Sequence, residues 1–329
     1  ESLPPALDSL PVDVISLKPV NVMGLPALRA LLIPERAAGA LHLTASLDVV
    51  DRPLKDLVDE IEAGESGLVM CMGKGGVGKT TIASSIAIAL AERGHPVHLT
   101  TTDPAAHLEQ TLDGAVDNLR VTRIDPVQAT QEYRDHVIAT KGEHLDEAGR
   151  ANLAEDLLSP CTEEVAVFRQ FSAVIREGRK GFVIVDTAPT GHTLLLLDAA
   201  GSYHRDMVRQ MGTTEGFRTP MMMLQDAAVT KVILVTLPEQ TPVLEASILQ
   251  ADLERAGIHP WAWVVNSSVA AARPTSAFLQ MRAASEAGPI ADVQRIAERL
   301  ALVPIQVLEP VGAARLSALA QGSSAPVPV

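Results

Sequence analysis

Residues 73–81 read Gly-Lys-Gly-Gly-Val-Gly-Lys-Thr-Thr, a glycine-rich phosphate-binding loop of the pattern G-x-x-x-x-G-K-[ST]. Its glycines let backbone N–H groups turn towards phosphate oxygens, while Lys79 reaches the terminal phosphates and the hydroxyl of Thr80 binds Mg²⁺. Lys74, directly after the first glycine, is additional to this pattern and hints at an assembly. We expect nucleotide contacts from Gly73, Gly75, Gly76, Val77, Gly78, Lys79, Thr80 and Thr81.

Two aspartates stand where an ATPase needs carboxylates. Asp103 follows the predicted strand at 97–102, and Asp186 follows the fully apolar run at 182–185, which is typical of a parallel strand. Side chains at the carboxyl ends of such strands face the ligand crevice of an α/β fold. We expect Asp103 to orient or deprotonate the attacking water, although it could instead cap a helix that begins with Pro104. Asp186 is the second acidic residue that a Mg²⁺-nucleotide needs.

Two residues near the end of the chain are candidates for the base pocket. Asn266 ends a predicted strand, where its amide could both donate to and accept from an adenine edge. A lone asparagine is also common as a turn residue. Pro304, which we expect on a further strand just before the closing helix, could line the base pocket.

A cysteine and a histidine are candidate ligands for something other than the nucleotide. Ser159 reads as a helix N-cap and Pro160 as the first helical residue, which puts Cys161 in the first turn. The helix N-terminus favours a thiolate there, while the two glutamates that follow oppose it. Cys161 is therefore either a partly buried structural cysteine or a thiolate ligand. His192 could be a ligand, a switch sensor or a packed histidine.

The elements that would position these side chains alternate between strand and helix. Strands are predicted at 68–72, 97–102, 182–185, 231–237 and 261–266, with helices at 81–93 and 241–256. This alternation predicts an α/β fold of the P-loop NTPase class, in which helices flank a mostly parallel β-sheet. We expect a helical insert at about 126–178, between the second strand and the Asp186 strand.

The composition limits the class of protein. The chain has 329 residues, of which 47% are hydrophobic, enough for one large domain with or without a small appendage. A formal charge of −13 and an aromatic content of 3% argue against nucleic-acid binding. No apolar stretch approaches the ~18 residues of a membrane span, and the start does not resemble a signal peptide. Two cysteines, Cys71 and Cys161, provide neither a disulfide framework nor a Cys-x-x-Cys metal clip, so we expect a cytosolic protein.

A pattern near the start of the chain recurs near its end. Residues 17–31 contain Leu-x-Pro-Val and Gly-x-x-x-Leu-x-Ala-Leu, and both return in residues 308–319. The repeat indicates a duplication, and the alternative is an ordinary N-terminal extension. We expect a remnant of the tail of a preceding ATPase half at 1–35, a linker at 36–66, the ATPase domain at 67–320 and a disordered tail at 321–329.

Several segments together resemble the arsenical pump-driving ATPase family, and specifically the C-terminal half of its duplicated chain. The resemblance runs from about residue 67 to residue 319 and includes the N-terminal remnant. It rests on the phosphate loop and on His98–Leu108, Ser159–Glu164, Asp186–Thr193, Thr219–Met222 and Leu237–Glu239. The loop is shared by the wider class of deviant phosphate-loop ATPases, whereas the cysteine segment is much narrower.

The resemblance implies roles for the residues around the phosphates. Two ATPase halves face each other in that family, so Lys74 would reach across to the nucleotide of the opposite half. Lys79 would hold the β- and γ-phosphates of ATP. Thr80 would bind Mg²⁺, and Asp186 would hold a water on that ion. Asp103 would position the attacking water.

The resemblance also implies a base site and a metalloid site. Asn266 and Pro304 would frame the adenine. Ser159, Cys161 and His192 match the positions that bind trivalent arsenic or antimony in this half, and a soft thiolate suits a soft metalloid. The other metalloid ligands of the family belong to the half that this chain lacks, so the site would be partial.

The resemblance further implies partners and a regulatory ligand. Arsenite or antimonite would act as an allosteric ligand that draws the two halves together and stimulates ATP hydrolysis. The partners would be a second, homologous ATPase half, an integral membrane arsenite efflux protein and an arsenite metallochaperone. The protein would be cytoplasmic and peripheral at the inner face of the plasma membrane when bound to the pump.

Two other functions share parts of these motifs. An ATP-dependent targeting factor for tail-anchored membrane proteins shares the loop, the Asp103 segment and Asp186, but commonly uses a Cys-x-x-Cys zinc clip that this chain lacks. A partitioning or division-site ATPase would be expected to carry a C-terminal amphipathic membrane helix, whereas residues 321–329 form a short polar and proline-containing tail. The cysteine segment favours the pump ATPase.

Overall fold

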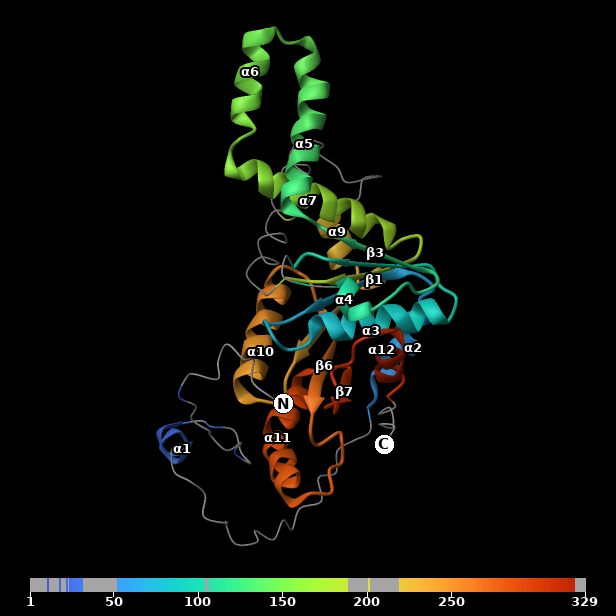
Figure 1. Ribbon diagram of the computed structural model, residues 1–329, viewed down its shortest axis with the longest axis vertical. Coiled ribbons are helices and arrows are strands. Elements are labelled where there is room, and N and C mark those ends of the chain that lie inside the picture. The colour runs from blue at the N-terminus through green and yellow to red at the C-terminus, as the bar shows by residue number, and fades with distance from the viewer. Residues whose placement is uncertain are drawn as a thin grey trace.

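The structure is a computed structural model that describes residues 24–31, 52–103, 108–188 and 219–322, with residues 11, 18, 22, 106 and 201 as isolated positions. It consists of a β-sheet between layers of helices, and a long helical hairpin projects from one end (Figure 1). Within these ranges, no helix is both long and apolar enough to span a membrane.

Seven parallel strands form the sheet, in the order β3-β2-β4-β1-β5-β6-β7. They are β1 (Gly67–Met72), β2 (Val97–Thr101), β3 (Leu119–Arg123), β4 (Phe182–Asp186), β5 (Thr230–Thr236), β6 (Pro260–Ser268) and β7 (Leu300–Pro304). The expected parallel α/β fold is confirmed, and β1, β2 and β4 are buried along their whole length. β3 is absent from the predicted strands because this edge strand reads Leu-Arg-Val-Thr-Arg and so lacks an apolar run.

Helices cover both faces of the sheet. One face packs against α3 (Lys79–Glu92), α4 (Leu108–Leu112) and α12 (Ala313–Ala320). The other face packs against α7 (Pro160–Glu177), α9 (Pro220–Gln225), α10 (Gln240–Arg255) and α11 (Ala277–Ile296). The predicted helices at 81–93 and 241–256 correspond to α3 and α10. Gly94 and Gly257 follow them in the left-handed region, with φ angles of 92° and 75°.

One helix lies in the segment expected to be a linker. α2 (Leu54–Glu62) buries Leu54, Leu57, Val58 and Ile61 in the core against α3, α12 and β7. Its polar side is held by Arg93, which pairs with Asp59 at 2.9 Å and with Glu62 at 2.6 Å. The packed part of the chain therefore begins before Gly67, because the apolar face of α2 completes the core on this side.

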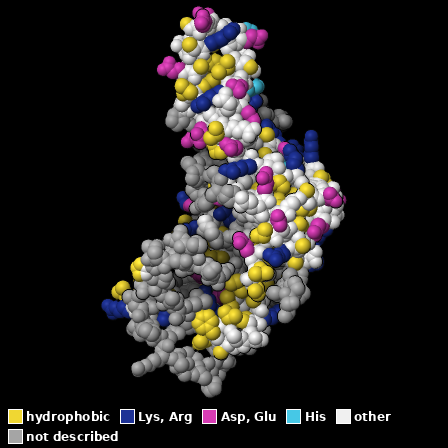
Figure 2. Space-filling view, in the orientation of Figure 1, with side chains coloured by type: hydrophobic (Ala, Val, Ile, Leu, Met, Phe, Trp, Pro, Cys, Tyr) yellow, Lys and Arg dark blue, Asp and Glu magenta, His cyan; other side chains and the backbone are white. Residues whose placement is uncertain are grey.

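The insert contains three helices. α5 (Pro126–Lys141) begins at an N-cap, Asp125, whose carboxylate accepts from the backbone N–H groups of Val127 and Gln128. A 3₁₀ turn (Gly142–His144) leads to α6 (Glu147–Asp156), and α7 returns to the sheet (Figure 1). Leu158 and Val165 are exposed by 66% and 47%, and hydrophobic side chains lie among charged ones on this projection (Figure 2).

The repeated pattern corresponds to two helices. α1 (Gly24–Leu31) begins at Gly24, and α12 follows Gly312, and the φ angles of these two glycines are 78° and 89°. Leu316 of α12 is fully buried, whereas its counterpart Leu28 in α1 is half exposed. The similar helix starts are compatible with a duplication, which stays a prediction.

Candidate nucleotide site

The phosphate loop joins β1 to α3 at the carboxyl edge of the sheet, and its glycines are required by space as well as by conformation. A Cβ atom on Gly73 would lie 2.4 Å from the carbonyl oxygen of Val235 at the end of β5. A Cβ on Gly78, whose φ is 90°, would lie 2.1 Å from Nδ2 of Asn266 at the end of β6. The loop is therefore confined between two strand ends, where side chains at these positions do not fit.

Lys79 lies over this loop. Its side chain is largely buried, and Nζ donates a hydrogen bond of 3.0 Å to the carbonyl oxygen of Lys74. Burial lowers the pKa of Lys79, and the carboxylates of Asp186 and Asp103 partly oppose this shift. The ammonium group thus lies near both predicted carboxylates, as a lysine that binds phosphate would require.

Asp186 lies beside Thr80. The hydroxyl of Thr80 donates to Oδ2 of Asp186 at 2.8 Å, and that of Thr101 donates to the same oxygen at 3.3 Å. Oδ1 of Asp186 is buried and has no hydrogen-bond partner among the described residues. Burial raises the pKa of Asp186 to about 6, against the opposing effects of Thr80 and Lys79. A buried carboxylate oxygen beside a threonine hydroxyl fits Mg²⁺ and its bound water, since this ion takes oxygen ligands.

Asp103 comes two residues after the end of β2. Its backbone N–H donates to Oγ1 of Thr101 at 3.0 Å, and the N–H of Thr102 donates to the carbonyl oxygen of Asp186 at 3.0 Å. The second bond links the ends of β2 and β4, so Asp103 and Asp186 lie at the same edge of the sheet as the phosphate loop. Pro104, on which the capping alternative rests, lies outside the described residues.

Lys74 extends from the loop to the neighbouring helix α10. Its Nζ forms an ion pair with Oε1 of Glu245, and the side chains of Lys74 and Glu245 are 54% and 34% exposed. Oε2 of Glu245 is buried and has no partner among the described residues. Lys74, which is expected to reach the nucleotide of the opposite half, is therefore bound by a carboxylate of its own chain.

Asn266 and Pro304 lie at the ends of neighbouring strands. Nδ2 of Asn266 donates to the carbonyl oxygen of Val77 at 3.0 Å, so this side chain supports the phosphate loop directly. Pro304 is the register partner of Ser268, two residues after Asn266. The two residues expected to frame the adenine are thus brought to one side of the loop.

The three predicted metalloid ligands are only partly described. Ser159 is exposed in the turn before α7, and Cys161 lies in the first turn of α7, as the sequence predicts. The side chain of Cys161 and all of His192 lie outside the described residues. Among the side chains that are described, no three His, Cys, Asp or Glu residues are grouped as a metal site. Cys71 is fully buried in β1, where burial raises the pKa of its thiol and disfavours the thiolate.

Comparison with known proteins identifies the family. A family model described as "Anion-transporting ATPase" matches residues 67–223. The "Arsenical pump-driving ATPase" of Escherichia coli is 56% identical over 321 residues, which are 97% of this chain and 55% of that protein. A protein of the same name from Acidiphilium multivorum is 55% identical over the same two shares. The "Putative arsenical pump-driving ATPase 2" of Aquifex aeolicus is 31% identical over 251 residues, 64% of this chain and 82% of that protein. The chain belongs to the arsenical pump-driving ATPase family.

The chain spans about half the length of the first two of these arsenical pump-driving ATPases. The matched family region contains the phosphate loop, Asp103, the helical insert and Asp186. Asn266 and Pro304 lie beyond it, in a part of the chain that the longer alignments with the arsenical pump-driving ATPases cover.

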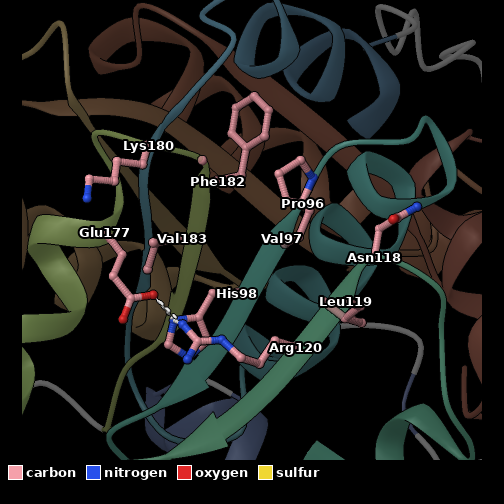
Figure 3. A pocket seen from close by; sticks show the side chains of 11 residues that line it. Pro96, Val97, His98, Asn118, Leu119, Arg120, Glu177, Lys180, Phe182 and Val183 are labelled. Atoms are coloured by element: carbon pink, nitrogen blue, oxygen red, sulfur yellow. Dashed lines mark hydrogen bonds and ion pairs between the residues drawn. The ribbon is translucent and has the colours of Figure 1, made fainter.

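A cavity of about 510 Å³ lies at the opposite edge of the sheet from the phosphate loop, Asp103 and Asp186, at the amino ends of β2, β3 and β4 (Figure 3). Nδ1 of the buried His98 is 3.0 Å from Oε2 of Glu177 and 2.8 Å from Nη2 of Arg120, which also bonds to Glu177. Burial and Arg120 lower the pKa of His98, Glu177 opposes this shift, and Nε2 of the ring lies 2.7 Å from the hydroxyl oxygen of Thr122. This cluster ties the C-terminal end of α7 to the sheet and is separate from the nucleotide site.

Two acidic residues that contact Lys74 or the exit of β6 were not predicted from sequence. Glu245 contacts Lys74 from α10, and Glu286 of α11 binds the chain directly after β6. For Glu245 the sequence holds no signal, because the two residues are 171 positions apart. For Glu286 a signal exists: it shares its helical spacing with Ala283, Ile290 and Val293, which all face the core. A glutamate on such a face is unusual and indicates a specific hydrogen-bonding role.

Proposed function

We propose that this chain hydrolyses Mg²⁺-ATP and acts as one half of a two-half ATPase that drives extrusion of arsenite or antimonite through a membrane pump. The observation that carries the proposal is the hydrogen bond between Thr80 and Asp186 beside the buried Lys79. A lysine, a hydroxyl and an acidic oxygen around a glycine loop suit phosphoryl transfer to water, which needs positioning and charge neutralisation. The arsenical pump-driving ATPases with about 55% identity support the pump function.

Each residue of the site would have a separate role in ATP hydrolysis. Lys79 would bind oxygens of the β- and γ-phosphates, and the backbone N–H groups of the loop would surround them. Thr80 would hold Mg²⁺, and Asp186 would accept a hydrogen bond from a water on it. When bound, Mg²⁺ neutralises charge that develops on the phosphate oxygens. Asp103 would orient a water for in-line attack on the γ-phosphorus, so that the bond to ADP breaks as the new P–O bond forms.

Lys74 would contribute to the nucleotide of the opposite half. To do so it must leave Glu245, with which it forms an ion pair within its own chain. A lysine that is available only when the halves meet would make hydrolysis depend on their association. This dependence suits an ATPase that drives a pump and should hydrolyse little ATP when no metalloid is bound.

Metalloid binding would drive that association. Ser159 precedes α7, Cys161 lies in its first turn, and His192 follows Asp186 by six positions. A metalloid held by these three residues would therefore connect the insert to the Mg²⁺ region. The opposite half would supply the remaining ligands. Asn266 and Pro304 would contact the adenine, and the other partners would be the membrane efflux protein and a metallochaperone that delivers arsenite. The working location would be the cytoplasmic side of the plasma membrane.

The proposal is tested by steady-state ATPase assays of this chain, alone and mixed with the matching N-terminal half, with and without antimonite. We expect stimulation by antimonite only in the mixture. Cys161→Ser should remove the stimulation, whereas the matched control Cys71→Ala should keep it, because Cys71 is a buried core residue.

The two unfavourable results have different meanings. Full antimonite response of the Cys161→Ser mixture would overturn the metalloid site but leave the ATPase in place. Absence of any response in all mixtures would instead favour the ATP-dependent targeting factor for tail-anchored proteins.

A further inference from the structure

Glu286 is a buried carboxylate whose oxygens are both occupied. It lies in the middle of α11 and is 6% exposed. Oε2 accepts from the hydroxyl of Ser268 at 2.7 Å and from the backbone N–H of Ala270 at 3.0 Å, while Oε1 accepts from the N–H of Val269 at 2.9 Å. The three donors are consecutive residues at the exit of β6, namely its last residue and the two that follow it. A buried ionised group is tolerated only when it is bonded in this way.

The segment that Glu286 holds has an irregular backbone. Ser267 has a φ of 55°, in the left-handed region that non-glycine residues seldom adopt. The register between β6 and β7 shifts between Val265 and Ser268. Such conformations persist only when surrounding contacts fix them, and Glu286 supplies three of these contacts. A fourth comes from Ser268, whose hydroxyl accepts from the N–H of Ala271 at 3.0 Å.

This segment is connected to the phosphate loop on its other side. Asn266, directly before Ser267, donates to the carbonyl oxygen of Val77 at 3.0 Å, and its Nδ2 fills the space that a side chain on Gly78 would need. The N–H of Ile305, directly after Pro304, donates to the carbonyl oxygen of Ser268 at 3.0 Å. The exit of β6 therefore sets the positions of both the phosphate loop and Pro304.

We propose that Glu286 is a positioning residue for nucleotide binding: its ionised carboxylate fixes the exit of β6, so that Asn266 holds the phosphate loop in its binding conformation. The inference rests on the proposed nucleotide site and concerns affinity rather than chemistry. Glu286 itself touches no phosphate. Its loss should weaken nucleotide binding while leaving the rate at saturating ATP nearly unchanged, because Lys79, Asp103 and Asp186 are untouched.

The charge of Glu286 provides a signature of this role. Burial raises its pKa, although Ala270, Ser268 and Val269 donate to it and Arg282, one turn earlier on α11, favours ionisation. The groups at the exit of β6 that face Glu286 are uncharged hydrogen-bond donors. α10 packs against α11, but none of its charged groups contributes to the pKa shift of Glu286. The carboxylate of Glu286 therefore gains a proton at a higher pH than an exposed glutamate does. Once protonated, it accepts hydrogen bonds less well. Nucleotide affinity should therefore fall as the pH falls through the pKa of Glu286.

The test compares the wild-type chain with Glu286→Gln, Glu286→Asp and the control Glu298→Gln, whose side chain is 84% exposed. A fluorescent ADP analogue is titrated without Mg²⁺ between pH 5 and pH 8, so that the binding of Mg²⁺ at Asp186 does not enter. Hydrogen exchange is measured for residues 73–79 and 266–271 in the free proteins. The rate at saturating ATP is measured in the mixture with the N-terminal half.

We expect Glu286→Gln to weaken binding of the analogue 5- to 20-fold at pH 8 and to change the saturated rate less than 2-fold. The acid-induced loss of affinity should be smaller in Glu286→Gln than in the wild type, and exchange should rise in both segments. Glu286→Asp should fall between the two, and Glu298→Gln should match the wild type. If Glu286→Gln fails to fold, Glu286→Asp and the pH dependence of exchange in the wild type decide the question.

Faster exchange confined to 266–271, with unchanged affinity, would show a local structural role and overturn the proposal. A wild-type chain that binds no nucleotide would overturn the proposed function instead. In that case the exchange of residues 73–79 in Glu286→Gln still reports whether Glu286 fixes the phosphate loop.

Discussion

Two buried carboxylates near the phosphate loop differ in what their oxygens do. Glu286 and Asp186 are almost completely buried, and burial raises the pKa of each. The oxygens of Glu286 accept three hydrogen bonds from its own chain, which marks it as a residue that supports structure. Oδ1 of Asp186 has no partner in the described part of the chain. A buried oxygen without a hydrogen-bond partner destabilises the protein unless a ligand contacts it. Of the two carboxylates, Asp186 is therefore the one suited to bind a ligand.

Asp186→Asn should stabilise the free protein at neutral pH while removing activity. The pKa of Asp186 is raised from 3.8 to about 6, so its charge costs stability above pH 6, and this cost disappears as the pH falls towards 4. At about 1.4 kcal/mol per pKa unit, we expect the substitution to raise the free energy of unfolding by about 1–3 kcal/mol at pH 7.5 and by nearly nothing at pH 4.

Urea unfolding at the two pH values measures this difference, and Asp117→Asn on the surface is the control. Mg²⁺-dependent ATP hydrolysis by the assembled halves should fall at least ~100-fold in Asp186→Asn, as expected when a group that aligns the metal and water is lost. A variant that is less stable than the wild type at pH 7.5 would contradict the unpaired state of Asp186.

At the scale of elements, the nucleotide site is built from strand ends and helices that hold one another. The loop after β1 is confined by the ends of β5 and β6, and its extra lysine is bound by α10. At the opposite edge of the sheet, Glu177 at the end of α7 binds His98 of β2 and Arg120 of β3. α7 is therefore fixed to the sheet at one end and carries Cys161 at the other, which suits it to transmit a change between the insert and the sheet.

Glu245→Gln should make association of the two halves easier. The variant cannot form the ion pair that holds Lys74 on α10, so less is lost when Lys74 reaches across. Because this pair is half exposed, the effect should be modest, roughly a 2- to 5-fold tighter ATP-dependent association. Analytical ultracentrifugation of the two halves with ATP and no metalloid measures it. Glu254→Gln on the same helix should behave as the wild type, and weaker association in Glu245→Gln would argue that Glu245 serves the assembled state instead.

At the scale of the whole molecule, the core extends beyond the segment that the motifs define. α2 precedes the phosphate-loop strand and packs against α12, near the other end of the described chain. Helices from both ends of the domain thus close the same face of the sheet. α1, in contrast, leaves Leu25 and Leu28 exposed by 67% and 51%. Within the described ranges, these two leucines pack into neither cluster of the core, and the origin of α1 in a preceding half stays a prediction.

Leu57→Ala should show that α2 is part of the folding unit. Leu57 is 3% exposed in the core, and truncation of a buried leucine costs about 2–4 kcal/mol of unfolding free energy. The matched control Leu25→Ala, on the exposed face of α1, should change stability by less than about 0.5 kcal/mol. Urea unfolding of both variants tests this, and equal stabilities would show that α2 only lies against the domain.

Features that are encoded locally could be predicted from the sequence alone. The phosphate loop, the aspartates that follow two predicted strands and the alternation of strand and helix depend on residues within a few positions of one another. Apolar runs and glycine patterns therefore sufficed to predict the parallel sheet, α3 and α10. The exposed edge strand β3 was missed because it lacks an apolar run. α2 was taken as linker although its apolar residues recur at helical spacing, and its packing shows that it belongs to the core.

Contacts between side chains that are distant in the sequence depend on how the strands are ordered and packed. Asn266 and Val77 are 189 positions apart, and Lys74 and Glu245 are 171 apart, so no local pattern relates them. Glu286 differs in that its helical spacing marks it as core-facing, yet the donors that explain it lie in an irregular strand exit that periodicity does not describe. Short sequence motifs identify the residues of the phosphate loop that would bind the nucleotide. The contacts that support this loop arise from strand order and packing.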